Sequence, residues 1–258
     1  MTTTTTGSPS PLPAPIGHRE ATVLAETAYA RFADAVAALG PADWSRPTDC
    51  EGWTVRDLVG HVVGAMRSAA SVRELVRQQL AVRRRHKESG GGPVDIMTAL
   101  QVELTAGLTT DELVAECRAL VRPATLGRKR TPWPVRRFAT MKVDMAPISE
   151  RWRMGYLLDV ILTRDAWLHR VDLSRAVDVP MALTADHDGR IVGDVVAEWA
   201  RRHGQPYHLT LGGPAGGVFR GGGPVPEPDR LELDAVEFCR IVSGRATGTG
   251  LLTTFVPF

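Results

Sequence analysis

The chain has 258 residues, of which 43% are hydrophobic and 23% are charged, and its formal net charge is +2. That length can bury a sizeable core in one large domain or two smaller ones, and the composition is typical of a globular protein. A net charge so close to zero predicts no general attraction to nucleic acid or to a membrane surface.

Residues 1–17, which include the run MTTTTTGSPSPLPAP, are rich in threonine, serine and proline and predict a disordered tail. This segment has neither the basic region nor the apolar stretch of a secretory signal peptide. From Arg19 onward, apolar residues recur at spacings of three and four, which is typical of an amphipathic helix. The first helix is therefore expected to begin there.

Three more helical segments follow. A second helix begins after Thr54, a residue suited to the N-cap, and is expected to reach about Arg85. Residues 95–122 predict a third helix or two shorter ones, and residues 148–176 predict a fourth. Because no convincing strand interrupts these segments, residues 18–182 predict a four-helix bundle with long connections.

The pattern changes in the last third of the chain. Residues 184–203 predict an amphipathic helix, and the segments YHLTLGG, GGVFRGG and RLELD alternate like short strands separated by glycine- and proline-rich turns. The following AVEFCRIVSGR predicts a short helix. Residues 183–258 therefore predict a small α+β domain.

Polar side chains interrupt the apolar stripe of the fourth predicted helix. Asp165, His169 and Asp172 continue, in steps of three and four, a row that begins with leucine and isoleucine. An unpaired buried carboxylate is costly, so Asp165 needs a cation, hydrogen bonds or water. On the second helix, His61 lies on a row of small and apolar residues and is expected to point inward as well.

These residues predict a metal site in the bundle interior. Two histidines and one carboxylate, with an open fourth position, are typical of a catalytic zinc site, and such ligands also accept nickel, cobalt, manganese or iron. A purely structural interpretation stays open, because a histidine on an apolar helix face is more often a hydrogen-bonded core residue than a ligand. The pair Asp165 and His169 could likewise be a satisfied polar pair.

Two motifs carry a resemblance to a known family. The segment CEGWTVRDLVGHVVG resembles the start of the second helix in the mycothiol-dependent maleylpyruvate isomerase family, within the DinB-like bundle superfamily, and RDAWLHRVDLSRA resembles that family's fourth-helix motif. The end of the chain, AVEFCRIVSGRATGTGLLTTFVPF, resembles the family's small C-terminal domain, which is similar to a sterol-carrier fold. The resemblance spans nearly the whole chain after residue 18.

The resemblance implies a divalent metal, usually zinc, held by His61, Asp165 and His169. The isomerases carry glutamate where this chain has Asp165. Because aspartate is one methylene shorter, two arrangements stay open: Asp165 is itself a ligand, or it orients a histidine while water completes the coordination. The resemblance further implies mycothiol as co-substrate, held as a thiolate that adds to a small electrophilic metabolite, in an isomerase or S-transferase reaction.

Several other residues are candidates for smaller roles. Arg245 is expected to hold a substrate carboxylate by a forked contact, with a structural arginine in a turn as the equal alternative. Asp172 either bonds the region of His169 or caps the end of its helix, the latter being favoured. Cys50 has no histidine near it in sequence, so a small buried residue is its better interpretation.

The partners expected are a small-molecule thiol and a small electrophile, with no nucleic acid, no membrane, and a monomer or homodimer as the assembly. Basic clusters at residues 83–87, 128–130 and 136–137 are interpreted as solvated helix ends. Three widely spaced cysteines and no disulfide pattern predict a cytoplasmic location. The alternative functions are a small-molecule or lipid-binding protein with a degenerate or structural metal site, and a protein-interaction module without turnover.

Overall fold

The computed structural model describes residues 12–223 and 228–258, and these form two compact units. One unit comprises residues 17–181 together with Phe258, and the other comprises residues 182–257 together with residues 12–16. Most of the predicted disordered tail, residues 1–11, lies outside the described residues. Residues 12–16 have no regular secondary structure, and Ala14 accepts a hydrogen bond from the Arg190 side chain at 2.8 Å.

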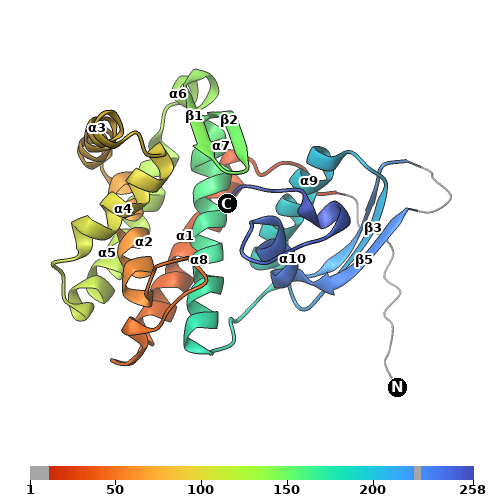
Figure 1. The fold of residues 1–258 in the computed structure, drawn as a ribbon, viewed down its shortest axis with the longest axis horizontal. Helices are drawn as coiled ribbons and strands as arrows, with labels where there is room; N and C mark the ends of the chain where they lie inside the picture. The colour runs from red at the N-terminus through yellow and green to blue at the C-terminus, as the bar shows by residue number, and fades with distance from the viewer. Residues whose placement is uncertain (1–11, 224–227) are drawn as a thin grey trace. The chain divides into compact units, whose positions relative to one another are not determined.

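The first unit is a helical bundle, which confirms the predicted fold class (Figure 1). Helix α2 packs against α4, α5 and α8, and α1 packs against α5 and α8. Their buried apolar side chains, Phe32 and Leu58 among them, form one continuous core. The helices of this bundle are α1 (His18–Ala37), α2 (Val55–Ala70), α3 (Val72–Ser89), α4 (Pro93–Thr105), α5 (Thr110–Arg130) and α8 (Leu162–Val177).

The second predicted helix is in fact two helices, α2 and α3. Ser71 ends α2 in an extended conformation and caps α3, its side chain accepting a hydrogen bond from the backbone N–H of Glu74 at 3.4 Å. A serine followed three residues later by glutamate is a helix start signal. The prediction of one helix to about Arg85 was therefore wrong at this break.

The prediction of a helix from residue 148 was also wrong at its start. Strands β1 (Thr140–Met145) and β2 (Ile148–Arg153) form an antiparallel hairpin in which Val143 and Trp152 are buried against Ile161. The chain then passes through the single turn α7 (Met154–Tyr156) and the π-helical turn η2 (Leu157–Ile161) before α8. Two shorter helical segments, η1 (Asp43–Ser45) and α6 (Trp133–Phe138), lie in connections.

The second unit is a small α+β fold, as predicted. Its three-stranded sheet has the order β4-β3-β5, with β3 antiparallel to β4 and parallel to β5. Buried side chains of α9 and α10, such as Trp199 and Phe238, cover one face of the sheet. The elements of this unit are η3 (Ala185–Gly189), α9 (Arg190–His203), β3 (Tyr207–Gly212), β4 (Gly217–Gly221), β5 (Asp229–Asp234), α10 (Ala235–Val242) and η4 (Gly250–Thr253).

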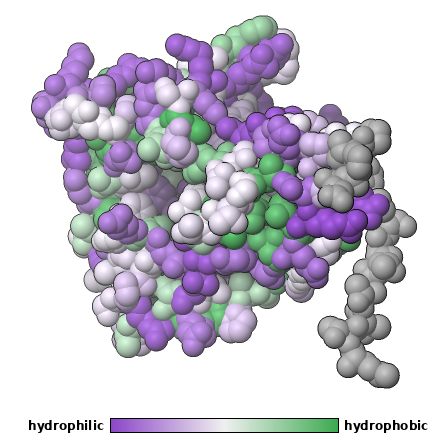
Figure 2. All heavy atoms as spheres, turned by 45° about the vertical axis from the view of Figure 1, so that its right-hand side comes forward, coloured by the Kyte–Doolittle hydropathy of each residue, from purple (hydrophilic) through white to green (hydrophobic). Residues whose placement is uncertain are grey.

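Hydrophilic side chains predominate on the face of the molecule drawn in Figure 2, with smaller apolar areas among them. Among the described residues, no helix has the length and apolar character that crossing a membrane requires.

Candidate metal centre

Three side chains from two helices of the bundle meet at one point. The Nε2 atom of His169 lies 3.3 Å from Oδ1 of Asp165, and the Nε2 atom of His61 lies 3.9 Å from the same oxygen. The two imidazole rings are 5.1 Å apart between centroids. One ligand atom from each residue can therefore face a common centre, since these atoms all lie within 4.8 Å of one another.

Helix α2 carries His61 into the core because of how the helix begins. Thr54 caps it, and a capping box with Asp57 satisfies the N–H groups of both residues. Gly60 and Gly64 flank His61 at a close approach of α2 to α4, where a Cβ on Gly64 would stand 2.6 Å from the Gln101 side chain. The sequence start signal therefore placed this helix correctly, and small residues let its neighbour pack beside the histidine.

Helix α8 supplies the other two groups. Asp165 and His169 are four residues apart, so they stand one above the other on the same face. His169 is buried, whereas 25% of the Asp165 side chain remains exposed. The π-helical turn η2 directly precedes α8, and turns of this kind often occur beside functional sites.

The second nitrogen of His169 is bonded to Asp172. Its Nδ1 atom lies 3.0 Å from Oδ2 of Asp172, a fully buried carboxylate. A carboxylate that accepts from Nδ1–H fixes the imidazole tautomer and turns Nε2 toward a ligand. The favoured prediction that Asp172 caps the helix end was wrong, because its carboxylate contacts this ring.

Cys50 lies in the same cluster although it is far away in the sequence. Its thiol donates to Oδ2 of Asp172 at 3.4 Å, and its sulfur lies 3.9 Å from Nδ1 of His169. Cys50 is half-buried. Cys50 has no histidine near it in the sequence, but the fold brings His169 beside its thiol, so the interpretation as a small buried residue is incomplete.

A turn in the segment CEGW brings Cys50 and Trp53 to the site. The N–H of Trp53 donates to the carbonyl of Cys50 at 3.0 Å, and Gly52 has a φ of +76°, which a side chain would strain. The Trp53 ring lies 5.1 Å from the His61 ring and 6.3 Å from the His169 ring. The indole therefore forms an apolar wall beside both imidazoles.

The electrostatics of the cluster distinguish the two histidines. Burial lowers the pKa of His61 below its ordinary value of 6.5, with a further lowering by His169 that the Asp165 carboxylate opposes. Burial acts in the same direction on His169, but Asp165 and then Asp172 outweigh it and raise the pKa of His169 well above 6.5. In the metal-free protein, these shifts favour the cationic form of His169, which lies between two carboxylates, and the neutral form of His61.

Asp165 completes this charge arrangement. Burial raises the pKa of its carboxyl, yet the charge and hydrogen bond of His169, with those of His61, outweigh burial and hold that pKa below its usual range. The Nδ1 atom of His61 is buried without a hydrogen-bond partner among the described residues, although the Gln101 side chain lies near enough to raise its pKa.

The donor set fits a divalent metal ion. At a tetrahedral ion with ligand bonds of about 2.0–2.1 Å, two ligand atoms lie about 3.3 Å apart. The separations of 3.3 Å and 3.9 Å from Oδ1 of Asp165 to the two imidazoles are close to that spacing. The shorter aspartate side chain therefore reaches the point where the two imidazoles meet, and a quarter of that side chain is exposed to solvent.

Arg245 belongs to the other compact unit. It follows α10 in a turn, where its side chain is half-buried and its backbone N–H donates to the carbonyl of Arg240 at 2.8 Å. Its role as a substrate contact stays a prediction.

Comparisons with known proteins identify the family of the chain and its fold. The sequence model described as the mycothiol maleylpyruvate isomerase N-terminal domain matches residues 25–174, which include all three candidate ligands. The chain therefore belongs to this family. None of the curated proteins compared with the chain matches its sequence.

Two solved structures resemble the chain over most of its length. The crystal structure of the mycothiol-dependent maleylpyruvate isomerase aligns with a TM-score of 0.54 and 17% sequence identity, covering 90% of this chain and 91% of that chain. A variant of that isomerase, with one histidine replaced by alanine, aligns with the same TM-score and 16% identity over the same shares of the two chains. This likeness confirms the mainly helical fold with a small sheet domain.

Proposed function

We propose that the chain is a metal-dependent enzyme that uses a small thiol, with mycothiol as the co-substrate, to isomerise or conjugate a small electrophile. The observation that carries this proposal is the convergence of His61, Asp165 and His169 on one point, with a single partly exposed carboxylate. Family membership and the fold support mycothiol as the thiol. The isomerase activity itself is named for the relatives, and we extend it to this chain.

A divalent metal held by these three residues would bind a thiol at its open position and keep it as a thiolate near neutral pH, where a free thiol with a pKa of about 8.5 is mostly protonated. Zinc is the first candidate, and nickel, cobalt and manganese accept the same ligands. The identity of the metal is open to direct analysis.

The reaction follows from the chemistry of a thiolate. Its sulfur adds to one carbon of an activated cis double bond, and the electron pair of that bond moves to the activating carbonyl. The former double bond is now a single carbon–carbon bond, and the adduct rotates about it. Elimination of the thiolate then gives the trans isomer and regenerates the thiol. With an electrophile that cannot eliminate the thiolate, the enolate left by the same addition takes a proton from solvent and a stable thioether remains, which is S-transfer.

The protein's own residues prepare this step. Asp172 holds the His169 ring with Nε2 turned inward, and burial keeps the His61 imidazole neutral and able to act as a ligand. Trp53 shields both rings from water on one side. We assign Arg245 the task of holding a substrate carboxylate, because a guanidinium makes forked contacts with that group.

We propose a cytoplasmic location and a monomer or homodimer as the assembly. None of the three cysteines, all of which lie among the described residues, forms a disulfide, and the proposed location is the reducing cytoplasm, in which a thiol co-substrate remains reduced. The proposed substrates are small molecules, and either a monomer or a homodimer accommodates them.

The test combines a defined assay with an open one. The zinc-loaded protein is given mycothiol and maleylpyruvate, and the cis-to-trans conversion is followed by absorbance. In parallel, mycothiol and a cell extract are incubated with the protein, and thiol adducts are sought by mass spectrometry. We expect turnover or a new adduct that disappears in His169→Ala and persists in the control His86→Ala, an exposed histidine on α3. If wild type and His169→Ala give the same products, the proposal is wrong.

A further inference from the structure

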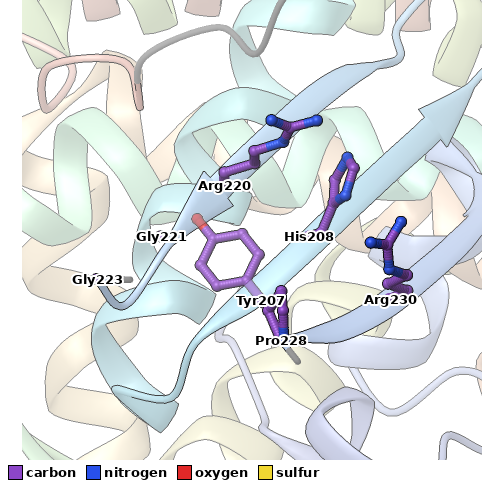
Figure 3. A pocket seen from close by; sticks show the side chains of 7 residues that line it. All are labelled: Tyr207, His208, Arg220, Gly221, Gly223, Pro228 and Arg230. Atoms are coloured by element: carbon purple, nitrogen blue, oxygen red, sulfur yellow. The ribbon is translucent and has the colours of Figure 1, made fainter. Parts of the chain in front are cut away.

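Two arginines and one histidine form a row across the sheet of the second unit, which includes residues 182–257. His208 on the central strand β3 pairs with Arg220 of β4 on one side and with Arg230 of β5 on the other. Residues that pair directly across neighbouring strands point to the same face. Figure 3 shows these three side chains on adjacent strands, so two guanidinium groups flank one imidazole.

Acidic residues lie beside this row, and Glu232 shares the face of β5 on which Arg230 lies. In the described part of the chain, no ion pair or hydrogen bond joins Arg220 or Arg230 to an acidic residue, even though Asp229 and Glu232 lie on the same strand as Arg230. Both arginines are exposed and His208 is half-buried. Each arginine is paired with the imidazole, and the two guanidinium charges repel each other across it.

The two arginines change the pKa of His208. Burial lowers its pKa, and the charges of Arg220 and Arg230 lower it further. Both guanidinium groups therefore act on the same imidazole, and an anion between them would relieve the repulsion.

The row borders a cavity. A cavity of about 410 Å³ is lined by all three residues together with Tyr207, and this volume is in the range of sites for small molecules. Tyr207 itself is 2% exposed, and its hydroxyl is buried without a hydrogen-bond partner among the described residues. The Tyr207 ring contacts Trp199 and His203 of α9, on the face of the sheet opposite the row, so this hydroxyl is not offered to a ligand beside the arginines.

We infer that this cavity is a binding site for a small organic dianion, which Arg220 and Arg230 hold from two sides. Adjacent strands lie about 4.8 Å apart, so the backbones that carry the two arginines are roughly 10 Å apart. Guanidinium groups bind carboxylate and phosphate oxygens in a forked manner. The site therefore suits either a phosphate ester bound between the arginines or a dicarboxylate with one end at each. This site lies wholly within the second unit and is separate from the metal ligands in the sequence and in the division of the chain.

The inference is tested by titrating the full-length protein with inorganic phosphate, with succinate and with the neutral succinamide, using calorimetry. We expect saturable binding of phosphate or succinate and no binding of succinamide. Arg220→Gln and Arg230→Gln should each weaken that binding about tenfold, because a charge-assisted hydrogen bond is lost. Arg201→Gln, which removes one exposed charge from α9 of the same unit, should leave it unchanged.

A second measurement locates the ligand independently of affinity. In a heteronuclear NMR spectrum, the imidazole signals of His208 should shift on addition of the bound anion, and those of His86 on α3 should not. A shift caused by phosphate would identify a phosphate group as the bound anion, and a shift caused by succinate would identify a dicarboxylate. Absence of binding up to about 10 mM, or binding that both arginine variants retain in full, overturns the inference.

Discussion

The Nδ1 atom of His169 lies 3.0 Å from Oδ2 of Asp172, and the opposite nitrogen of the same ring lies 3.3 Å from Asp165. One imidazole is thus held between a buried carboxylate that orients it and a partly exposed carboxylate that shares its candidate metal. In metal sites, a histidine ligand commonly donates its second ring N–H to a carboxylate in this way. This arrangement explains why α8 has two aspartates and one histidine together at this point of the bundle.

Replacing Asp172 tests the orienting role. We expect Asp172→Asn to lower the affinity for zinc by roughly 10- to 100-fold, because the amide no longer fixes the ring tautomer or increases the basicity of the ring. Competition with a chromophoric chelator measures the change. Asp144→Asn, in the exposed part of the hairpin, is the matched control, and equal affinities in the two variants would contradict the role of Asp172.

The two arrangements left open for Asp165 predict different outcomes. If its carboxylate is a ligand, Asp165→Asn should weaken zinc binding by more than the roughly 10- to 100-fold that loss of an orienting carboxylate costs, whereas Asp165→Glu keeps a carboxylate and should stay closer to wild type. The 3.3 Å and 3.9 Å separations from the two imidazoles favour this result. A loss of only about 10- to 100-fold in Asp165→Asn would instead assign Asp165 the orienting role, with water completing the coordination, and unchanged affinity would contradict both arrangements.

The metal-free protein should be most stable near pH 6.5. The pKa of His169 is raised, so its ion pairs stabilise the fold fully below 6.5 and are lost as the pH rises through the higher folded value. The pKa of His61 is lowered, so its neutral form is favoured in the fold, and stability falls as the pH drops below 6.5.

Thermal unfolding with a chelator present, scanned from pH 5 to pH 9, measures this dependence. We expect His169→Gln to remove most of the alkaline decline and His61→Gln to reduce the acidic one. Wild-type protein whose unfolding temperature does not change across this range would show that the two histidines do not titrate as the geometry requires.

A close approach of α2 and α5 predicts a large effect of one methyl group. A Cβ on Gly127 would stand 1.9 Å from the backbone oxygen of Ala69, so the helices must separate. We expect Gly127→Ala to lower the free energy of unfolding by about 3 kcal/mol. Gly107→Ala, where no atom lies within 4 Å of the added carbon, should change it by less than about 1 kcal/mol. Urea unfolding of both variants checks this, and equal stabilities would contradict the packing of the bundle.

The pattern of residues in the sequence was sufficient to predict the bundle and the three candidate ligands. Their helical spacing determines which side chains share a face, and the start signal at Thr54 places His61 one and a half turns or more inside α2. The hairpin over residues 140–153 was missed because only Val143 and Trp152 are buried in it, so its alternation is weak.

Other features depend on contacts between distant segments. Cys50 and Trp53 reach the histidines through a turn that requires Gly52 at a positive φ. In the sequence, Gly52 is the main indication of this turn. The row of His208, Arg220 and Arg230 depends on the parallel pairing of β3 with β5, whose register the sequence does not reveal.

The most direct test of the central claim is the metal content of the purified protein after reconstitution with zinc and removal of the unbound ion. Elemental analysis by mass spectrometry should find one zinc per chain in wild type and in the control His86→Ala, and less than a tenth of that in His61→Ala and His169→Ala. Folded wild-type protein that retains no zinc, or histidine variants that retain as much as wild type, would contradict a metal centre at His61, Asp165 and His169.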